Sequence, residues 1–348
     1  MSKKGGKDKK KKKPEEEDES TVNLPRIYRR KCESLGVSQN RFFREKVEQA
    51  IDDQDHLKKV KLQQIKKQFK YKKTQLHTLE PLSSLDVRAI MESLIDLKYK
   101  HIQSLKLVKA ECQDEAVQYI CNYMEKGRGV KFLNLPHNLI GYQGCEYLGK
   151  SVGNTEFVQI QKLKLDFNNI GTKGLGLLAK GLSMNPYIMR LSLNYCNIDS
   201  YGVKYLQQIL AYVESQLWSL KLRGNFLRNE GIYQLFRSLE YNQALQKLIV
   251  ANNQFGESEE IPVIEKICEV MMKNNSLQIY DLDQNGIYDE GAKKLLECTK
   301  MYKIIKRVPL QDHISYEIKA EFKKVTKKRK FKLKKKKKKK KGKKKKKK

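Results

Sequence analysis

The residues best equipped for chemistry form an acidic run near the C-terminal end, D-L-D-Q-N-G-I-Y-D-E-G at residues 281–291. Asp281, Asp283 and Asn285 stand at alternate positions before a glycine, as the first ligands of a calcium-binding loop do. Such a loop needs a bidentate glutamate at its twelfth position, where this chain has Ala292. The spacing therefore argues against a calcium site.

Other chemistry-bearing side chains are scattered. The five histidines and seven cysteines share no C-x-x-C pair and no cluster with the spacing of zinc ligands. Phosphate-binding loops, nucleophile elbows and H-E-x-x-H motifs are absent from the sequence as well. An odd number of dispersed cysteines, mostly at apolar positions, favours reduced thiols over a disulfide framework. We therefore expect a protein that is not an enzyme and that has no cofactor and no metal.

A repeated sequence pattern accounts for most of the acidic run and for a large part of the remaining chain. Its frame, L-x-L-x-x-N-x-I-x-x-x-G, is clearest between Leu163 and Gly174. The alternating leucines predict a short strand that buries one face, and apolar spacings of three and four after the glycine predict a helix. Each copy is therefore one strand and one helix that stack on the neighbouring copies. The first leucine position recurs in steps of 28 to 32 residues, at Leu105, Leu133, Leu163, Leu191, Leu220, Leu248 and Tyr280.

A small polar residue follows each predicted strand. A side-chain amide at this place can bond the backbone of the turn, so we expect these residues to form a ladder that satisfies buried polar groups. Cysteine at one position is a small substitute with a poor S–H donor. The predicted structural ladder is Asn138, Asn168, Cys196, Asn225, Asn253 and Asn285.

The frame resembles the leucine-rich repeat in its long, helix-containing ribonuclease-inhibitor type, over roughly residues 100–312. The resemblance implies an α/β solenoid shaped like a horseshoe, with parallel strands on the concave face, helices outside and an N-terminal helical cap. Lysine-rich ends joined to such repeats are similar to those of axonemal and ciliary leucine-rich repeat proteins. A Ran GTPase-activating protein has the same repeat type, but that family usually carries an acidic region after its repeats, where this chain is basic.

Composition divides the chain into four parts. Residues 1–21 are rich in Lys and Glu and are expected to be disordered. Residues 22–79 are interpreted as a helical module with a basic connector, and residues 80–321 as the repeat domain with its caps. Residues 322–348 are expected to be a disordered poly-lysine tail, because like charges repel and few residues are apolar. From Lys323 onward there are 20 lysines, one arginine and no acid, in a chain whose net charge is +33.

The concave face is the expected binding surface. It is built from the residues between and just after the two leucines, and its charge grades from basic in the first repeats to acidic in the last. Aromatic residues and arginine are enriched at protein interfaces, so a protein partner is favoured, while a solvated face with incidental aromatics is the alternative. The predicted protein-binding residues are Lys164, Phe167, Asn194, Tyr195, Lys221 and Arg223.

Taken together, the sequence favours a non-enzymatic scaffold for protein–protein interaction. The horseshoe binds a protein partner, and the lysine tail tethers it to an acidic polymer through counterion release. No apolar run is long enough to cross a membrane and no secretory signal is visible, so we expect a cytoplasmic protein. The resemblance favours tubulin tails, the cytoskeleton and the cilium, whereas charge fits any polyanion or a merely solubilising end. A nuclear or nucleolar RNA-associated protein is the alternative, and a GTPase-activator-like regulator comes third.

Overall fold

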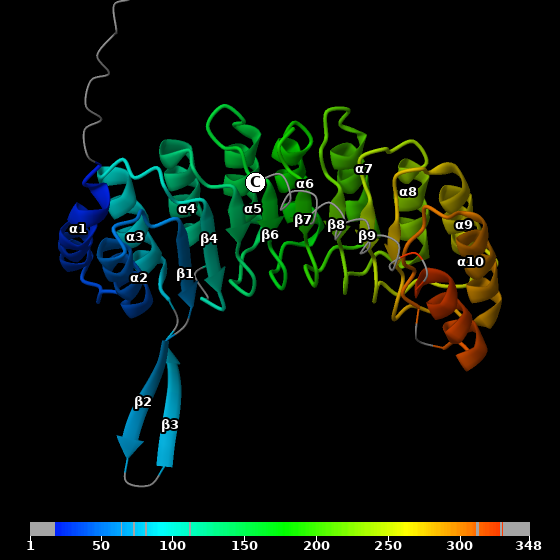
Figure 1. Ribbon diagram of the computed structural model, residues 1–348, viewed down its shortest axis with the longest axis horizontal. Coiled ribbons are helices and arrows are strands. Elements are labelled where there is room, and N and C mark those ends of the chain that lie inside the picture. The colour runs from blue at the N-terminus through cyan, green and yellow to red at the C-terminus, as the bar shows by residue number, and fades with distance from the viewer. Residues whose placement is uncertain are drawn as a thin grey trace, which may run out of the picture.

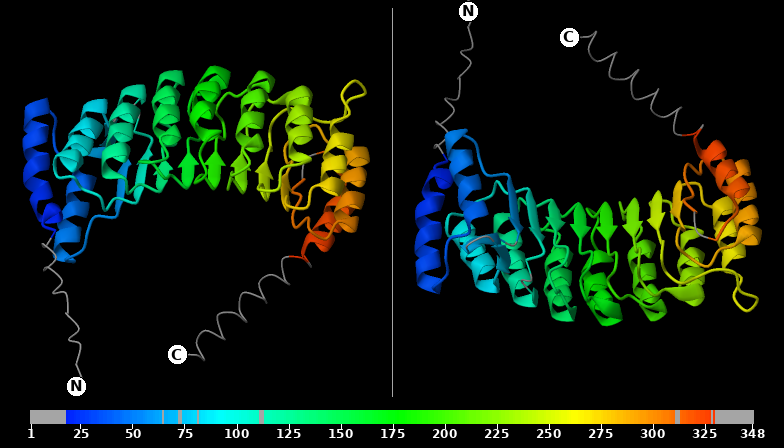
Figure 2. Two further views of the ribbon diagram at one scale, coloured as in Figure 1. Left: turned by 90° about the horizontal axis from the view of Figure 1, so that it is seen from above. Right: turned by 90° about the horizontal axis from the view of Figure 1, so that it is seen from below.

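The protein is a curved solenoid with one layer of strands and one layer of helices (Figure 1). Figure 2 shows the strands along the inner side of the curve and the helices along the outer side. The predicted α/β solenoid is therefore confirmed. The computed structural model describes residues 18–63, 65–71, 74–80, 82–110, 113–310, 313–327 and 329.

Eight of the described strands form one parallel sheet in sequence order. They are β1 (Lys59–Gln63), β4 (Ser104–Val108), β5 (Phe132–Asn134), β6 (Lys162–Lys164), β7 (Arg190–Ser192), β8 (Ser219–Lys221), β9 (Lys247–Ile249) and β10 (Ile279–Asp281). A separate antiparallel hairpin consists of β2 (Ile65–Tyr71) and β3 (Thr74–Glu80).

The helical layer alternates with these strands along the chain. Its members are α1 (Ser20–Leu35), α2 (Arg41–Asp52), α3 (Ser84–Asp96), α4 (Gln113–Gly127), α5 (Tyr142–Gly153), α6 (Gly171–Leu182), η1 (Ser200–Gly202, a 3₁₀ helix), α7 (Val203–Ala211), α8 (Arg228–Leu239), α9 (Val263–Lys273) and α10 (Asp289–Met301). Within the described residues, no helix is both long enough and apolar enough to span a bilayer.

The repeat frame sets the register of the sheet. Its first leucine positions pair directly from strand to strand, as Leu133 does with Leu163 and Leu248 does with Tyr280. All of these side chains are essentially buried against the helical layer. Because side chains alternate along a strand, the residues on either side of each leucine face the open inner surface.

The sheet begins one strand earlier than the sequence predicts. β1 pairs in parallel with β4, which places Val60 beside Leu105 and Leu62 beside Leu107, and all four side chains are buried. The composition of this segment predicts a basic connector, with a repeat domain that starts at residue 80. The hairpin β2–β3 projects away from the sheet in Figure 1. It is inserted between β1 and α3, so β1 and β4 are not separated by the repeat period in the sequence.

The N-terminal cap consists of α1 and α2. The rings of Tyr28 and Phe43 meet edge to face at 4.8 Å between centroids, and both residues are buried. Thr21 is buried as well, so the folded part begins inside the range 1–21 that we expect to be disordered. Residues 1–17 lie outside the described residues.

The C-terminal boundary also differs from the prediction. Residues 316–327 form a further helix, and its Phe322 is only 4% exposed because it packs on the last repeat. The prediction of disorder from residue 322 onward is therefore wrong for the first part of that range. The poly-lysine run at residues 331–348 lies outside the described residues.

Arg329 provides a second anchor at this end. Its guanidinium nitrogens donate hydrogen bonds to the carbonyl oxygens of Thr299, at 2.5 Å, and Tyr302, at 2.9 Å. These carbonyls belong to the end of α10, where backbone acceptors have no partner within the helix. The residue that looks like part of a charged tail therefore caps a helix.

Candidate protein-binding face

Two rows of side chains run straight across the inner face, one before and one after the buried leucines. The pairing register aligns each row, so that its members stand on adjacent strands about 4.8 Å apart. The first row is Ser104, Phe132, Lys162, Arg190, Ser219, Lys247, Ile279 and Arg307. The second row is Lys106, Asn134, Lys164, Ser192, Lys221, Ile249 and Asp281.

Cations recur along both rows, from Lys162 to Arg307. Burial, together with nearby lysine and arginine side chains, lowers the pKa of Lys162 and of Lys247. Burial is the larger cause for both lysines and the neighbouring cations add to it, so an anionic partner would stabilise their charged form. We call this group the concave basic cluster; its members are Lys162, Lys164, Arg190, Lys221, Lys247 and Arg307.

One carboxylate inside the cluster is already engaged. Asp166 is 3% exposed, and its Oδ2 lies 3.1 Å from Lys164 Nζ. Its Oδ1 accepts hydrogen bonds from Ser192 Oγ at 2.7 Å and from the backbone amide of Asn194 at 3.1 Å. The side-chain oxygen of Asn194 in turn accepts from the backbone amide of Arg223 at 2.9 Å. Among the predicted binding residues, Lys164 and Asn194 are thus fixed in a network between repeats.

Arg223 reaches toward the acidic end of the face. One of its nitrogens donates to Gln284 Oε1 at 3.0 Å, and another lies 3.9 Å from Asp281 Oδ1. Burial raises the pKa of Asp281, while Arg223 acts in the opposite direction. Among the described residues, Lys162, Lys221 and Lys247 make no ion pair, so these lysines are available to an anionic partner.

An aromatic stack runs beside the cluster, formed by His137, Phe167 and Tyr195. Its rings are nearly parallel, with centroids 4.2 Å apart in the first pair and 4.6 Å apart in the second. The strand spacing sets these distances, because all three residues occupy the same position of successive repeats. Burial and nearby Lys109 lower the pKa of His137, which favours the neutral ring. Phe167 is 43% exposed and offers an apolar edge to a partner.

The backbone under the aromatic stack is left-handed. The φ angles are 55° at His137, 59° at Phe167 and 53° at Tyr195, and Gly224 follows in the next repeat at 70°. A Cβ atom on Gly224 would lie 2.2 Å from the ring of Tyr195. The missing side chain therefore lets that ring lie flat against the neighbouring repeat, which ends the stack.

Gly224→Ala is expected to destabilise the protein more than Gly171→Ala does. Both glycines have positive φ, but a Cβ atom on Gly171 would meet nothing within 4 Å. Forcing a side chain into an occupied space costs about 1–3 kcal/mol beyond the backbone strain that both variants share. Urea unfolding of the two variants measures the difference, and equal losses would show that the Tyr195 ring is not held in place.

The repeat is recognised independently of this geometry. A family model described as "Leucine Rich repeat" matches residues 160–179 and 273–296, which contain β6 and β10 with parts of their helices. The protein carries leucine-rich repeats. Proteins of this class generally mediate protein–protein interaction. The ribonuclease-inhibitor subtype stays a prediction.

Curated relatives match only in part. The repeat protein is 27% identical over 199 residues to NACHT, LRR and PYD domains-containing protein 14 of Mus musculus, a match that covers 56% of this chain and 19% of that protein. It is 31% identical over 139 residues to Leucine-rich repeat-containing protein 45 of Gallus gallus, covering 40% of this chain and 20% of that protein. The chain thus spans about a fifth of the length of these relatives.

Solved structures give weaker likenesses. A structure of Leiomodin-1 Actin-Binding Site 2 is 11% identical with a TM-score of 0.35, covering 57% of this chain and 95% of that one. A TLR13–ssRNA13 complex is 13% identical with a TM-score of 0.38, covering 65% and 35%. These scores are low, and the assignment depends on the repeat instead.

Proposed function

We propose that this leucine-rich repeat protein is a non-enzymatic scaffold whose concave face binds an acidic segment of a protein partner. The observation that carries the proposal is the concave basic cluster, in which Lys162 and Lys247 stand in register with other cations and in which burial, together with those cations, lowers their pKa. An acidic partner would be attracted to these cations and would stabilise their charged form. The aromatic stack supplies the apolar contact that interface hot spots need.

A protein segment fits this face better than a nucleic acid does. The face ends in Asp281 and Asp283, which would repel a phosphate backbone that tracks along all the strands. A short acidic peptide can lie over the middle repeats alone. Aromatic rings beside the lysines of the concave basic cluster suit a segment that combines carboxylates with apolar side chains.

Exchanging Lys162, Lys221 and Lys247 for alanine is expected to weaken binding of an acidic peptide about tenfold. Three partly exposed ion contacts at about 0.5 kcal/mol each give this magnitude. The probe is a fluorescent peptide of alternating glutamate and phenylalanine, measured by anisotropy with the full chain and with a chain ending at Lys330. Without the tail, the second chain isolates the face.

The matched control removes the same charge from the helical layer. Lys180, Lys204 and Lys293 lie on α6, α7 and α10 and are exposed, so their triple alanine variant should bind the peptide within about twofold of the parent. Equal weakening in both triple variants would mean that net charge alone attracts the peptide. The concave face would then have no special part in binding.

We also propose that the lysine-rich end tethers the scaffold to an acidic polymer, with the tails of tubulin favoured. Composition supports a polyanion partner, and the resemblance to axonemal leucine-rich repeat proteins supports the cytoskeleton, the cilium and a cytoplasmic location. An RNA-bound nuclear protein is the competing outcome.

A further inference from the structure

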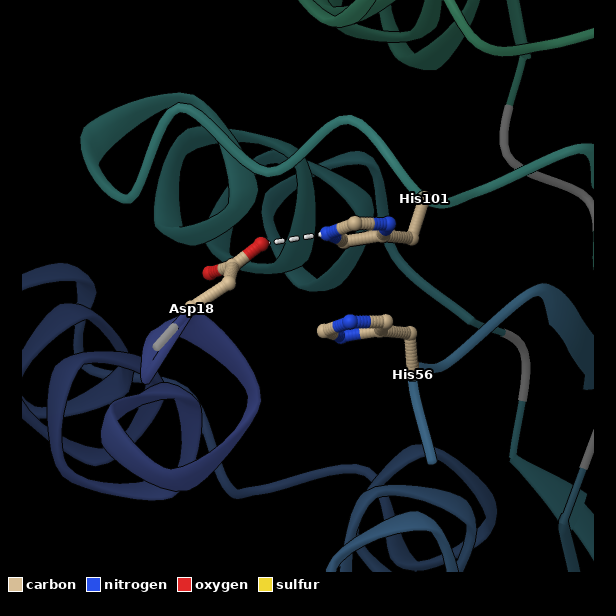
Figure 3. Close-up of side chains that lie close together, drawn as sticks. All are labelled: Asp18, His56 and His101. Atoms are coloured by element: carbon tan, nitrogen blue, oxygen red, sulfur yellow. Dashed lines mark hydrogen bonds and ion pairs between the residues drawn. The ribbon is translucent and has the colours of Figure 1, made fainter. Parts of the chain in front are cut away.

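Asp18, His56 and His101 come together at the N-terminal end of the solenoid, although the sequence separates them widely (Figure 3). Asp18 precedes α1, His56 lies between α2 and β1, and His101 lies between α3 and β4. One ligand atom from each residue lies within 4.8 Å of the other two. His101 Nε2 is 2.5 Å from Asp18 Oδ2, and the two imidazoles stack with centroids 3.6 Å apart.

Two buried hydroxyl groups, from Thr21 and Tyr99, lie beside the ring of His56. Thr21 Oγ1 lies 3.2 Å from His56 Nδ1 and 3.1 Å from the hydroxyl of Tyr99. Thr21 is 5% exposed and Tyr99 is 1% exposed. When Nδ1–H donates to Thr21, the lone pair on Nε2 of His56 is free. Metal-binding histidines are commonly held in this way, with the second ring nitrogen bonded to a neighbouring oxygen.

The carboxylate of Asp18 is accessible. Its Oδ1 accepts a hydrogen bond from the backbone amide of Ser20 at 3.0 Å, while its Oδ2 faces His101. The side chains of Asp18 and His101 are 45% and 30% exposed, so an ion can reach them from solvent. Asp18 therefore offers a charged oxygen beside two imidazole rings.

We propose that Asp18, His56 and His101 bind a divalent transition metal of the zinc class. Two imidazole nitrogens and one carboxylate oxygen are a common ligand set for Zn²⁺, with water completing a tetrahedron. Imidazole also selects such ions over Mg²⁺ and Ca²⁺, which prefer oxygen ligands. The parallel rings cannot both point a lone pair at one ion, so one imidazole must turn about its Cβ–Cγ bond on binding.

The ion would connect three segments of the N-terminal cap. It would tie the start of α1 to the loop before β1 and the loop before β4, which are otherwise joined here by a few hydrogen bonds. Binding to the folded state alone stabilises that state by mass action. The site is therefore expected to be structural, and its occupancy should raise the melting temperature.

Zinc titration of the full chain tests the proposal. The protein is first treated with a chelator, and ZnCl₂ is then added during calorimetry and thermal unfolding, with MgCl₂ as a parallel titrant. We expect one equivalent of Zn²⁺ to bind and raise the melting temperature, and Mg²⁺ to do neither. His56→Gln and His101→Gln should each weaken Zn²⁺ binding by at least about 100-fold, since even supporting partners contribute about 10–100-fold.

Two further variants make the test specific. Thr21→Val keeps all three ligands and should weaken binding about tenfold with unchanged stoichiometry. His313→Gln removes an exposed histidine near the other end of the solenoid and should change nothing. Circular dichroism checks that each variant is folded. Unchanged affinity in the His56→Gln and His101→Gln variants, or no binding by the parent chain, would overturn the proposal.

Discussion

Asn225→Ala is expected to lower the free energy of unfolding by at least about 3 kcal/mol. The side chain is 1% exposed, and its Oδ1 accepts hydrogen bonds from the amides of Cys196 and Ile198, both at 3.1 Å. Its Nδ2 donates to the carbonyl oxygens of Leu193 at 2.9 Å and Leu222 at 2.7 Å. The carbonyl oxygen of Leu222 still accepts a hydrogen bond from Asn253 Nδ2 in the variant. The amides of Cys196 and Ile198 and the carbonyl oxygen of Leu193 are left without this partner, at a cost of about 1–3 kcal/mol each.

Cys196→Ala is the matched control because it occupies the same position one repeat earlier. Its Sγ is 3.3 Å from the carbonyl oxygen of Leu165, a weak hydrogen bond from a poor donor. The cost should therefore be clearly smaller than that of Asn225→Ala. Equilibrium unfolding in urea, followed by circular dichroism, compares the two. Equal losses would mean that the amides of the ladder contribute no more than packing does.

The sheet could be predicted because each position of the repeat has one physical task. Leucines two apart must share a face, and a period of 28 to 32 residues places those faces side by side. The asparagine position is equally constrained. The backbone amide of Asn138 donates to Asn168 Oδ1 at 2.9 Å, so one side chain serves the repeat before it as well as its own.

The ends of the solenoid could not be predicted in the same way. An inserted hairpin separates Val60 and Leu62 from their helix, and a fixed period cannot detect a repeat that has been interrupted. At the other end, Ile318, Phe322 and Val325 have helical spacing, but the lysines between them obscure it. Both segments, β1 and the helix at residues 316–327, pack on the core, but their many lysines make the apolar spacing difficult to recognise in the sequence.

The candidate face was only partly visible in the sequence. Repeat spacing placed Phe167 beside Tyr195, and the structure stacks their rings. The same alternation rule, applied to the residue before each leucine, would also have found Lys162 and Lys247. That Arg223 reaches Gln284 two repeats away depends on side-chain length and direction, which the repeat frame does not specify.

Ending the chain after Lys330 is expected to weaken binding to long acidic polymers sharply, leaving only the contribution of the concave face, and to leave the fold intact. Residues 331–348 contain fifteen lysines and no acid, and each contact with a polyanion releases counterions. Ending the chain after Glu321 should damage the fold as well. It deletes Phe322, which is 4% exposed, at a cost of about 3–5 kcal/mol, together with the Arg329 cap of α10.

Co-sedimentation with microtubules measures both effects when the tubulin tails are intact or removed by proteolysis. The full chain should bind intact microtubules and lose affinity steeply with salt, whereas the chain ending at Lys330 should sediment far less at an unchanged melting temperature. Only the comparison between the two truncations separates loss of the tail from loss of folding, because the shorter one removes packed residues.

RNA competition then decides what the tail recognises. A polyanion binder without preference is displaced by RNA at equal charge, which would favour the nuclear alternative over the microtubule. Weak competition supports tubulin tails, whose attachment must then involve more than charge density. If the chain ending at Lys330 still binds microtubules that lack their tails, the concave face itself contacts the lattice. The acidic partner of that face would then be tubulin, and the two binding elements would share one polymer.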